Sequence, residues 1–449
     1  MRTRFLTALA LLAAPAIAEG GSQPISASVR VYRHVTLIDA ISASAQPDMA
    51  VTLEGDRIRA VSSDRTYVPI PQAEEIDARG LYVLPGLIET HGHLGTQPLR
   101  RYAEAVMRRQ LYGGITAARD LAGDTRFLAE IQREALLGEI PGPDIHFVAL
   151  MAGPSFFSDP RTKASAQGAM PGQTAWMQAI DDRTDIPLAV AKARGTGATA
   201  IKLYANLSPR IVQRITDEAH RQGIKVWAHA TVFPALPVDV VHAGVDVVSH
   251  VCSLVYQING VRAGTYHQRR AIDPAAFAEG DSPQLAKLFS AMRRQGQVLD
   301  ATLRVYARQA PIPAGPRRCD LALGARLANQ AWRAGVPISA GTDGETEWSD
   351  PYPSLHEEIE LLTDKAGLPP IDAIKAATVV AARAAGQEQE MGTIEPGKLA
   401  NLVFVERNPL DDVSNLRSVV FTIKRGKLFR REDYRPLAKG DLDEPGLNQ

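Results

Sequence analysis

Two histidines one residue apart, His91 and His93, stand at the end of the apolar segment LYVLPGLIETHGH. Residues i and i+2 of a β-strand point to the same face, so the two imidazoles would face one way and Gly92 the other. Two neutral imidazoles on one face can supply half of the ligands of a metal site. The pair alone is a weak signal, because exposed histidines occur at this spacing by chance.

Four further residues stand at the ends of apolar runs. Lys202 lies in TAIKLY, His229 in KVWAHA, His250 in DVVSHV and Asp343 at the end of PISAGTD. A lysine in an apolar strand is unusual, because burying an unpaired ammonium is costly. Taken alone, Lys202 is more simply explained as a side chain that reaches the rim. Together with the histidines and the aspartate, it predicts one shared site.

The elements that would position these residues alternate between strand and helix. Helical stretches such as SPRIVQRITDEAHRQG are amphipathic, and they separate eight short apolar runs. The runs lie at 83–91, 114–120, 144–151, 199–204, 225–230, 246–251, 298–303 and 337–342. This order predicts an α/β fold with a (β/α)8 TIM barrel, whose active site forms at the carboxyl ends of the strands. The alternative is a doubly wound open sheet, but the Gly-rich phosphate loop typical of that fold is missing.

The two ends of the chain have a different pattern. SVRVYRHVTLID and MAVTLEGDRIRAV alternate apolar and polar residues, and Glu54-Gly55-Asp56-Arg57 supplies a hairpin turn. Similar β-branched runs return near the C-terminus. We therefore predict a small β-sandwich domain built from 26–84 and 391–434, with the barrel of 85–390 inserted between its halves.

These motifs, in this order, resemble those of the amidohydrolase superfamily of metal-dependent hydrolases. VLPGLIETHGH is similar to the family's opening motif, GIKVWAHA and AGVDVVSH to its later histidine motifs, and SAGTD to its aspartate motif. The resemblance covers most of the chain after the N-terminal segment. ITAARDLAG and GATAIKLY are most similar to the branch that contains imidazolonepropionase-like proteins, Xaa-Pro dipeptidases (prolidases) and ochratoxin-type amidases.

The resemblance implies a role for each of the six residues. His91, His93 and Asp343 would hold one divalent metal ion, and His229 and His250 a second. Lys202, carboxylated by CO2, would bridge the two ions. The N/O ligand set fits Zn²⁺ best, and Mn²⁺ or Fe²⁺ are alternatives. A hydroxide between two metal ions is a nucleophile at neutral pH, and Asp343 would accept its proton and return it to the leaving amine. A mononuclear enzyme with an unmodified Lys202 is the alternative.

Two residues are candidates for substrate contact. Tyr204 could donate a hydrogen bond to the substrate carbonyl or simply be a rim tyrosine. Arg304 could bind a substrate carboxylate, but a salt bridge at the rim is the favoured interpretation. Where many dipeptidase-like relatives have a Gly-Gly-His-Gly loop, this chain reads MAGPSFFSDP, so the substrate stays open. Phe156 and Phe157 would form an apolar wall there or pack in the core.

We therefore predict an exported binuclear amidohydrolase that cleaves an amide C–N bond, with a dipeptide or an N-acyl amino acid as substrate. A hydrolase of cyclic amides, lactones or other esters is the second candidate. A non-catalytic periplasmic binding protein is disfavoured, because every ligand position is filled. The formal net charge is zero, which gives no indication of a nucleic-acid partner. The protein could form a homo-oligomer, for which the sequence fixes no symmetry.

The N-terminus has the pattern of a secretion signal. Arg2 and Arg4 precede the apolar stretch FLTALALLAAPAIA, and cleavage after Ala18 fits its small residues. This stretch is shorter than the ~20 residues of a membrane span, so we expect a periplasmic or secreted protein without a membrane span. Cys252 and Cys319 are the only cysteines. Two cysteines in a chain this long do not indicate a disulfide framework, and separate thiols are the favoured interpretation.

Overall fold

The computed structural model describes residues 29–258, 265–268, 274–277, 280–308, 319–345 and 349–436. The expected signal peptide at 1–18 lies outside the described residues, as does much of the polar stretch 257–282 that follows the sixth predicted barrel strand.

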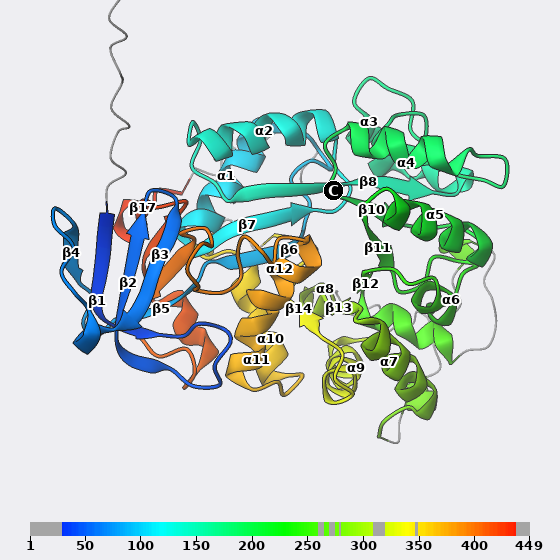
Figure 1. The fold of residues 1–449 in the computed structure, drawn as a ribbon. Coiled ribbons are helices and arrows are strands. Elements are labelled where there is room, and N and C mark those ends of the chain that lie inside the picture. Colours follow the sequence, from blue (N-terminus) through cyan, green and yellow to red (C-terminus); the bar gives the residue numbers. More distant parts are fainter. Residues whose placement is uncertain are drawn as a thin grey trace, which may run out of the picture.

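The centre of the molecule is a nearly closed barrel of parallel strands (Figure 1). In spatial order the strands are β6 (Leu87–Gly92), β7 (Ile115–Asp120), β8 (Asp144–Ala152), β10 (Ala200–Leu203), β11 (Lys225–His229), β12 (Val247–Ser249), β13 (Val298–Asp300) and β14 (Ile338–Ser339). Each lies within one of the eight predicted apolar runs or overlaps it, and the predicted TIM barrel is confirmed. A short strand that was not predicted, β9 (Met177–Ala179), pairs with β8.

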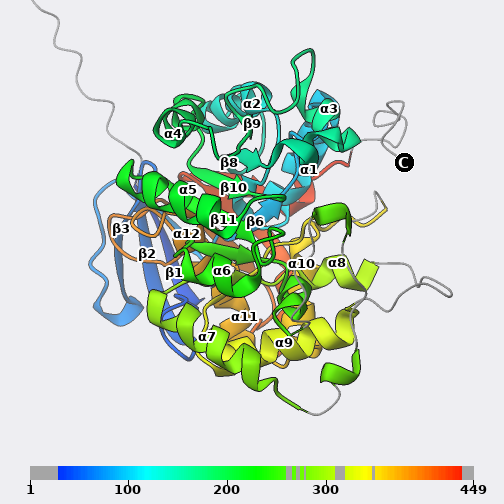
Figure 2. The ribbon, with the colours of Figure 1, turned by 90° about the vertical axis from the view of Figure 1, so that its right-hand side faces the viewer.

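Helices surround the barrel, as the view in Figure 2 shows. They are α1 (Arg100–Tyr112), α2 (Thr125–Leu137), α3 (Pro160–Ala166), α4 (Ile186–Gly195), α5 (Pro209–Arg221), α6 (Pro237–His242), α7 (Pro283–Gln295), α8 (Leu303–Arg308), α9 (Leu321–Arg333), α10 (Leu355–Asp364), α11 (Pro370–Ala376) and α12 (Val379–Ala385). The start of α5 shows why they form where they do. Ser208 accepts a hydrogen bond from the Ile211 amide, and Pro209 occupies the first turn, where its missing N–H costs nothing.

The seam between the first and last barrel strands brings two candidate ligands together. The Thr90 amide donates to the Ala340 carbonyl at 3.3 Å, and the Asp343 amide donates to the His91 carbonyl at 2.9 Å. Residues 250 positions apart in the sequence are thus held by direct backbone hydrogen bonds. The position of His91 relative to Asp343 therefore depends on barrel closure and not on a flexible loop.

Both chain ends build the second sheet, at the left of Figure 1. Its strands run in the order β17 (Lys427–Arg430), β16 (Val419–Lys424), β15 (Leu402–Val405), β5 (Tyr82–Pro85), β1 (Val29–Leu37), β2 (Gln46–Glu54) and β3 (Arg57–Ser63), with β4 (Glu74–Asp77) beside β1. Glu54 pairs with Arg57, so the predicted hairpin turn is present. The sheet has its own apolar core, in which the rings of Phe404 and Phe421 stack 4.4 Å apart. The predicted β-sandwich domain formed from both chain ends is confirmed.

Cys252 and Cys319 form a disulfide, with their Cα atoms 5.6 Å apart. The expectation of separate thiols was therefore wrong. Cys252 lies in the 3-10 helix η3 (Val251–Gln257), directly after β12, and Cys319 lies two residues before α9. These segments contact one another because β12 and β13 are neighbours in the barrel, a proximity that the separation of 67 residues conceals.

Candidate metal centre

Imidazole and carboxylate groups converge at the carboxyl ends of the barrel strands. One ligand atom from each of His91, His250 and Asp343 lies within 4.8 Å of the other two. His93 Nε2 lies 2.7 Å from Asp343 Oδ1, and His91 Nε2 lies 3.4 Å from the same oxygen. The ring centroids of His229 and His250 are 4.7 Å apart. All four histidines named from the sequence are therefore brought to one place, together with the aspartate.

Three residues at consecutive strand ends have left-handed backbone conformations. His250 follows β12 with φ of 70°, Thr302 follows β13 with 50°, and Asp343 follows β14 with 50°. Such conformations are unfavourable for residues other than glycine and are concentrated at functional sites. Here they turn the chain at the ends of three neighbouring strands, where ligand atoms of His250 and Asp343 lie within 4.8 Å of one another.

The electrostatics of the site favour neutral imidazoles around an ionised carboxylate. Burial lowers the pKa of His250 to about 3, and burial together with nearby Lys202 lowers that of His229 well below its usual range. Burial alone would raise the pKa of Asp343, but His91 and His93 hold it well below its ordinary value. Neutral imidazole nitrogens and a carboxylate oxygen are ligands that Zn²⁺ accepts.

Lys202 lies inside the barrel and is only 1% exposed. Its Nζ donates a hydrogen bond to Ser249 Oγ at 3.2 Å. Burial lowers the lysine pKa to about 8, against the opposing charges of Asp300 and Asp343. Lys202 therefore does not reach the rim, and its lowered pKa leaves more of it as the neutral amine near neutral pH than an exposed lysine would have.

One buried residue of the site was missed in the sequence. Asp300, the last residue of β13, is fully buried, and its Oδ2 lies 2.6 Å from His91 Nδ1. The signal was present, because the run QVLDATL places a carboxylate in an apolar strand in the same way that TAIKLY places a lysine. No pattern in the sequence indicates that Ser249 would lie between Asp300 and Lys202.

The candidate substrate residues take different positions. Tyr204 is half-buried, and its ring lies 4.1 Å from that of His229, beside the candidate ligands. Arg304 is buried and forms an ion pair, in which its Nε lies 2.9 Å from Glu357 Oε2. Arg304 thus makes the ion pair favoured from the sequence, although it is buried and not at an exposed rim.

The two phenylalanines of the loop after β8 differ in burial. Phe156 is buried and packs against Tyr204 at 4.6 Å, whereas Phe157 is only partly buried. The ring of Tyr266 lies 5.9 Å from that of Tyr204. Aromatic side chains therefore line the side of the site next to His229.

Other histidines lie away from the site. His146 is half-buried near the start of β8, and His356 donates its Nε2–H to the Gly113 carbonyl oxygen at 2.8 Å. His34, Asp48 and Asp64 form a second group with metal-ligating atoms, in the β-sandwich domain. Asp64 is already paired there with an arginine at 2.7 Å, so this group has a structural explanation.

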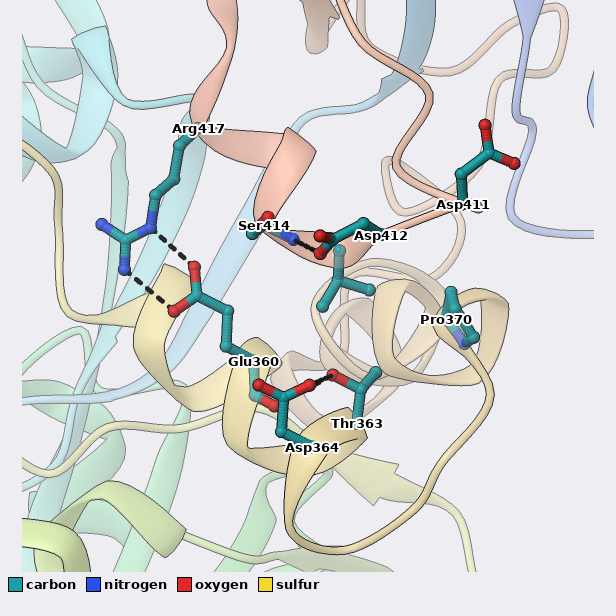
Figure 3. A pocket seen from close by; sticks show the side chains of 9 residues that line it. Glu360, Thr363, Asp364, Pro370, Asp411, Asp412, Ser414 and Arg417 are labelled. Atoms are coloured by element: carbon teal, nitrogen blue, oxygen red, sulfur yellow. Dashed lines mark hydrogen bonds and ion pairs between the residues drawn. The ribbon is translucent and has the colours of Figure 1, made fainter.

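A cavity of about 650 Å³ lies on the outside of the barrel, between α10, α11 and the 3-10 helix η6 (Val413–Arg417) (Figure 3). Four of its nine lining residues are acidic. Glu360 is paired with Arg417, and Asp412 accepts a hydrogen bond from the Ser414 amide. Two of the carboxylates therefore stabilise the local fold, and we assign this cavity no ligand.

Comparison with known proteins identifies the family of this chain. The sequence profile of the amidohydrolase family matches residues 82–429. The chain belongs to the amidohydrolase family. An ochratoxinase from Aspergillus niger is 24% identical over 397 residues, which cover 78% of this chain and 75% of that enzyme. Family membership makes the protein a hydrolase, and the six candidate ligands lie at the carboxyl ends of the barrel strands, the face on which TIM barrels carry active sites.

Solved structures show the same fold. The crystal structure of the A. niger ochratoxinase matches 92% of this chain and 98% of its own, with a TM-score of 0.69 and 21% identity. A Xaa-Pro dipeptidase with bound methionine in its active site matches 90% of this chain and 100% of its own, with a TM-score of 0.67 and 20% identity. This chain thus shares its fold with both proteins.

Proposed function

We propose that this amidohydrolase is a binuclear metal-dependent enzyme that cleaves the amide C–N bond of a dipeptide or an N-acyl amino acid outside the cytoplasm. The observation that carries the proposal is the convergence of His91, His250 and Asp343 within 4.8 Å, above a buried lysine. The alternative of a non-catalytic binding protein would not require this set of ligand atoms.

The residues present fit two divalent metal ions. His91, His93 and Asp343 would hold one ion, and His229 and His250 the second. Lys202, which is partly the neutral amine near pH 8, can react with CO2 and release a proton to form a carbamate, which would supply oxygen ligands to both ions. The carbamate is an anion between two cations, which removes the cost of burying an ammonium there.

Bound divalent ions would lower the pKa of water and polarise the scissile carbonyl. The protein's own groups then complete the reaction. Asp343 is ionised and 24% exposed at the mouth, so its carboxylate can accept the proton of the attacking water and return it to the leaving amine. Tyr204 keeps its phenolic proton, because burial raises its pKa, and can donate a hydrogen bond to the substrate carbonyl.

The substrate class is inferred from the relatives and from the pocket wall. The similar proteins include an ochratoxinase, a Xaa-Pro dipeptidase and a prolidase complexed with N-methylphosphonate-L-proline. Tyr204, Phe157 and Tyr266 would offer apolar surface to a side chain of the substrate. Because Arg304 is paired with Glu357, we assign it no carboxylate-binding role in the resting protein.

Two features support export. The segment 1–18 has the pattern of a signal peptide, and Cys252 and Cys319 form a disulfide. Disulfides persist in oxidising compartments and are rare in the cytosol. No helix in the part of the chain that the structure describes is long and apolar enough to cross a membrane. From the signal-peptide pattern and the disulfide we propose that the enzyme acts in the periplasm or the medium.

The first experiment measures metal content and turnover on one sample. The chain from Glu19 onward, loaded with Zn²⁺ and bicarbonate, should contain about two metal ions and hydrolyse members of a panel of dipeptides and N-acyl amino acids. Asp343→Asn should abolish turnover and keep the fold and most of the metal. Lys202→Ala should reduce the content to one ion or none, whereas Lys192→Ala, on the exposed face of α4, should not change it.

The outcomes separate the candidates. Two metal ions with no turnover on this panel would favour cyclic amides, lactones or other esters as substrates. Two ions in Lys202→Ala would contradict the bridging lysine. A protein that takes up no metal in the presence of bicarbonate would contradict the proposed function itself.

A further inference from the structure

Four buried polar side chains at the candidate metal centre, those of Asp300, His91, Ser249 and Lys202, form a connected layer. Asp300 Oδ2 lies 2.6 Å from His91 Nδ1 and 2.9 Å from Ser249 Oγ. Ser249 Oγ accepts a hydrogen bond from Lys202 Nζ at 3.2 Å. One carboxylate thus connects, directly and through a single hydroxyl, to two of the six candidate ligands. All four residues are at most 1% exposed, so water cannot replace these contacts freely.

The contacts determine where the protons lie. A carboxylate only accepts hydrogen bonds, so His91 must donate its Nδ1–H to Asp300, and its Nε2 keeps a free lone pair. The distances from the other ring nitrogen of His91 agree with this proton position. His91 Nε2 is 3.4 Å from Asp343 Oδ1, too long for a good hydrogen bond, whereas His93 Nε2 is 2.7 Å from the same oxygen and must be a donor. His91 is therefore ready to bind a cation, and His93 must first lose a proton.

Ser249 limits the protons on Lys202 in the same way. A hydroxyl has one proton and two lone pairs. The proton of Ser249 points to Asp300, and its lone pairs accept from Lys202 Nζ and from Trp227 Nε1. Ser249 therefore accepts a single N–H from the lysine. The nitrogen of a carbamate has a single N–H, and a neutral amine that donates one N–H here keeps its lone pair for CO2. An ammonium would have further protons to satisfy.

We propose that Asp300 is a positioning residue that fixes the proton on His91 Nδ1 and, through Ser249, orients the Lys202 amine before a metal ion binds. The purpose of this arrangement rests on the proposed function, but the proton positions are a property of the metal-free protein. If the layer only filled the barrel, an apolar residue with the shape of aspartate would replace Asp300 without affecting His91.

The test uses Asp300→Leu, which keeps the branched shape and removes both acceptors, and Asp300→Asn, which keeps one. Nitrogen-15 spectra of histidine-labelled, metal-free protein, assigned with His91→Asn, should show His91 with its proton on Nδ1 in the wild type and in Asp300→Asn. In Asp300→Leu the proton should shift towards Nε2. Zn²⁺ affinity, measured by competition with a chelator, should fall about 10–100-fold in Asp300→Leu. An unchanged His91 proton in Asp300→Leu would overturn the proposal, even if that variant were less stable.

Ser249→Ala tests the lysine half separately and keeps the proposal testable if Asp300→Leu does not fold. It should leave the proton of His91 on Nδ1 but slow the bicarbonate-dependent uptake of the second ion. Ser339→Ala on β14, two strands away from Ser249 in the barrel, is the matched control, because the Ser339 hydroxyl is equally buried and has no hydrogen-bond partner among the described residues. Equal uptake by these two variants would overturn the role of Ser249. A wild type that binds no metal but has the expected His91 proton would contradict the proposed function and support the positioning.

Discussion

Removing the Cys252–Cys319 disulfide should destabilise the protein without emptying the metal site. The bond spans 67 residues of sequence, and the entropy lost by the unfolded chain on closing such a loop corresponds to about 4 kcal/mol. The double variant Cys252→Ala/Cys319→Ala should therefore unfold at a lower urea concentration. His250 should stay in place, because its amide donates to the Asp300 carbonyl at 2.9 Å independently of the disulfide. We thus expect near wild-type metal content at room temperature.

Urea unfolding followed by circular dichroism, with and without dithiothreitol, measures the effect. The reductant should move the wild-type midpoint to that of the double variant, because both cysteines become accessible on unfolding, and it should not move the variant's midpoint. Equal midpoints for the oxidised wild type and the variant would refute the argument, because the disulfide would then add nothing to the free energy of unfolding.

Two further predictions concern the site and the response to acid. A methyl group on Gly341 would lie 2.2 Å from Asp300 Oδ1 and 2.7 Å from His91 Cβ, so Gly341→Ala should reduce the metal content. Gly195→Ala is the control: nothing lies within 4 Å of the added methyl group, so the metal content should not change. Burial lowers the pKa of His356 to about 3. The unfolded chain binds a proton at this residue below about pH 6.5, whereas the folded chain does not. The free energy of unfolding of the wild type should therefore fall by about 2 kcal/mol more than that of His356→Gln between pH 7 and pH 5, as measured by urea midpoints. Equal pH dependence of the two proteins would contradict this.

The barrel could be predicted because each strand is buried on both faces and therefore reads as an apolar run. Lys202, His229 and His250 stood out as polar interruptions at the ends of such runs. Asp300 is the same kind of interruption, but it contacts a candidate ligand and is not one of the family's metal ligands, so the ligand pattern does not include it. Its role depends on a neighbour, His91, that is 209 positions away in sequence.

The disulfide and the second sheet show what periodicity cannot supply. Cys252 and Cys319 are close because β12 and β13 pair in the barrel, and no local pattern encodes the distance between them. The hairpin of β2 and β3 was predicted from its turn. The pairing of β15 with β5, which joins the two ends of the chain in one sheet, depends on tertiary packing that alternation alone does not specify.

The layer of Asp300, Ser249 and Lys202 has a consequence for how the site assembles. Burying a charged carboxylate or amine without partners would reduce the stability of the fold by several kcal/mol. In small metal-binding domains the bound metal compensates for this cost, and such domains unfold when the metal is removed. Here the buried groups are hydrogen-bonded to one another in the metal-free chain, inside a barrel with a large apolar core of its own. The ligands are therefore arranged by folding. A chelator should remove activity and leave the far-ultraviolet circular dichroism of the protein unchanged, and unfolding on chelation would show that the metal, and not this layer, holds the strand ends together.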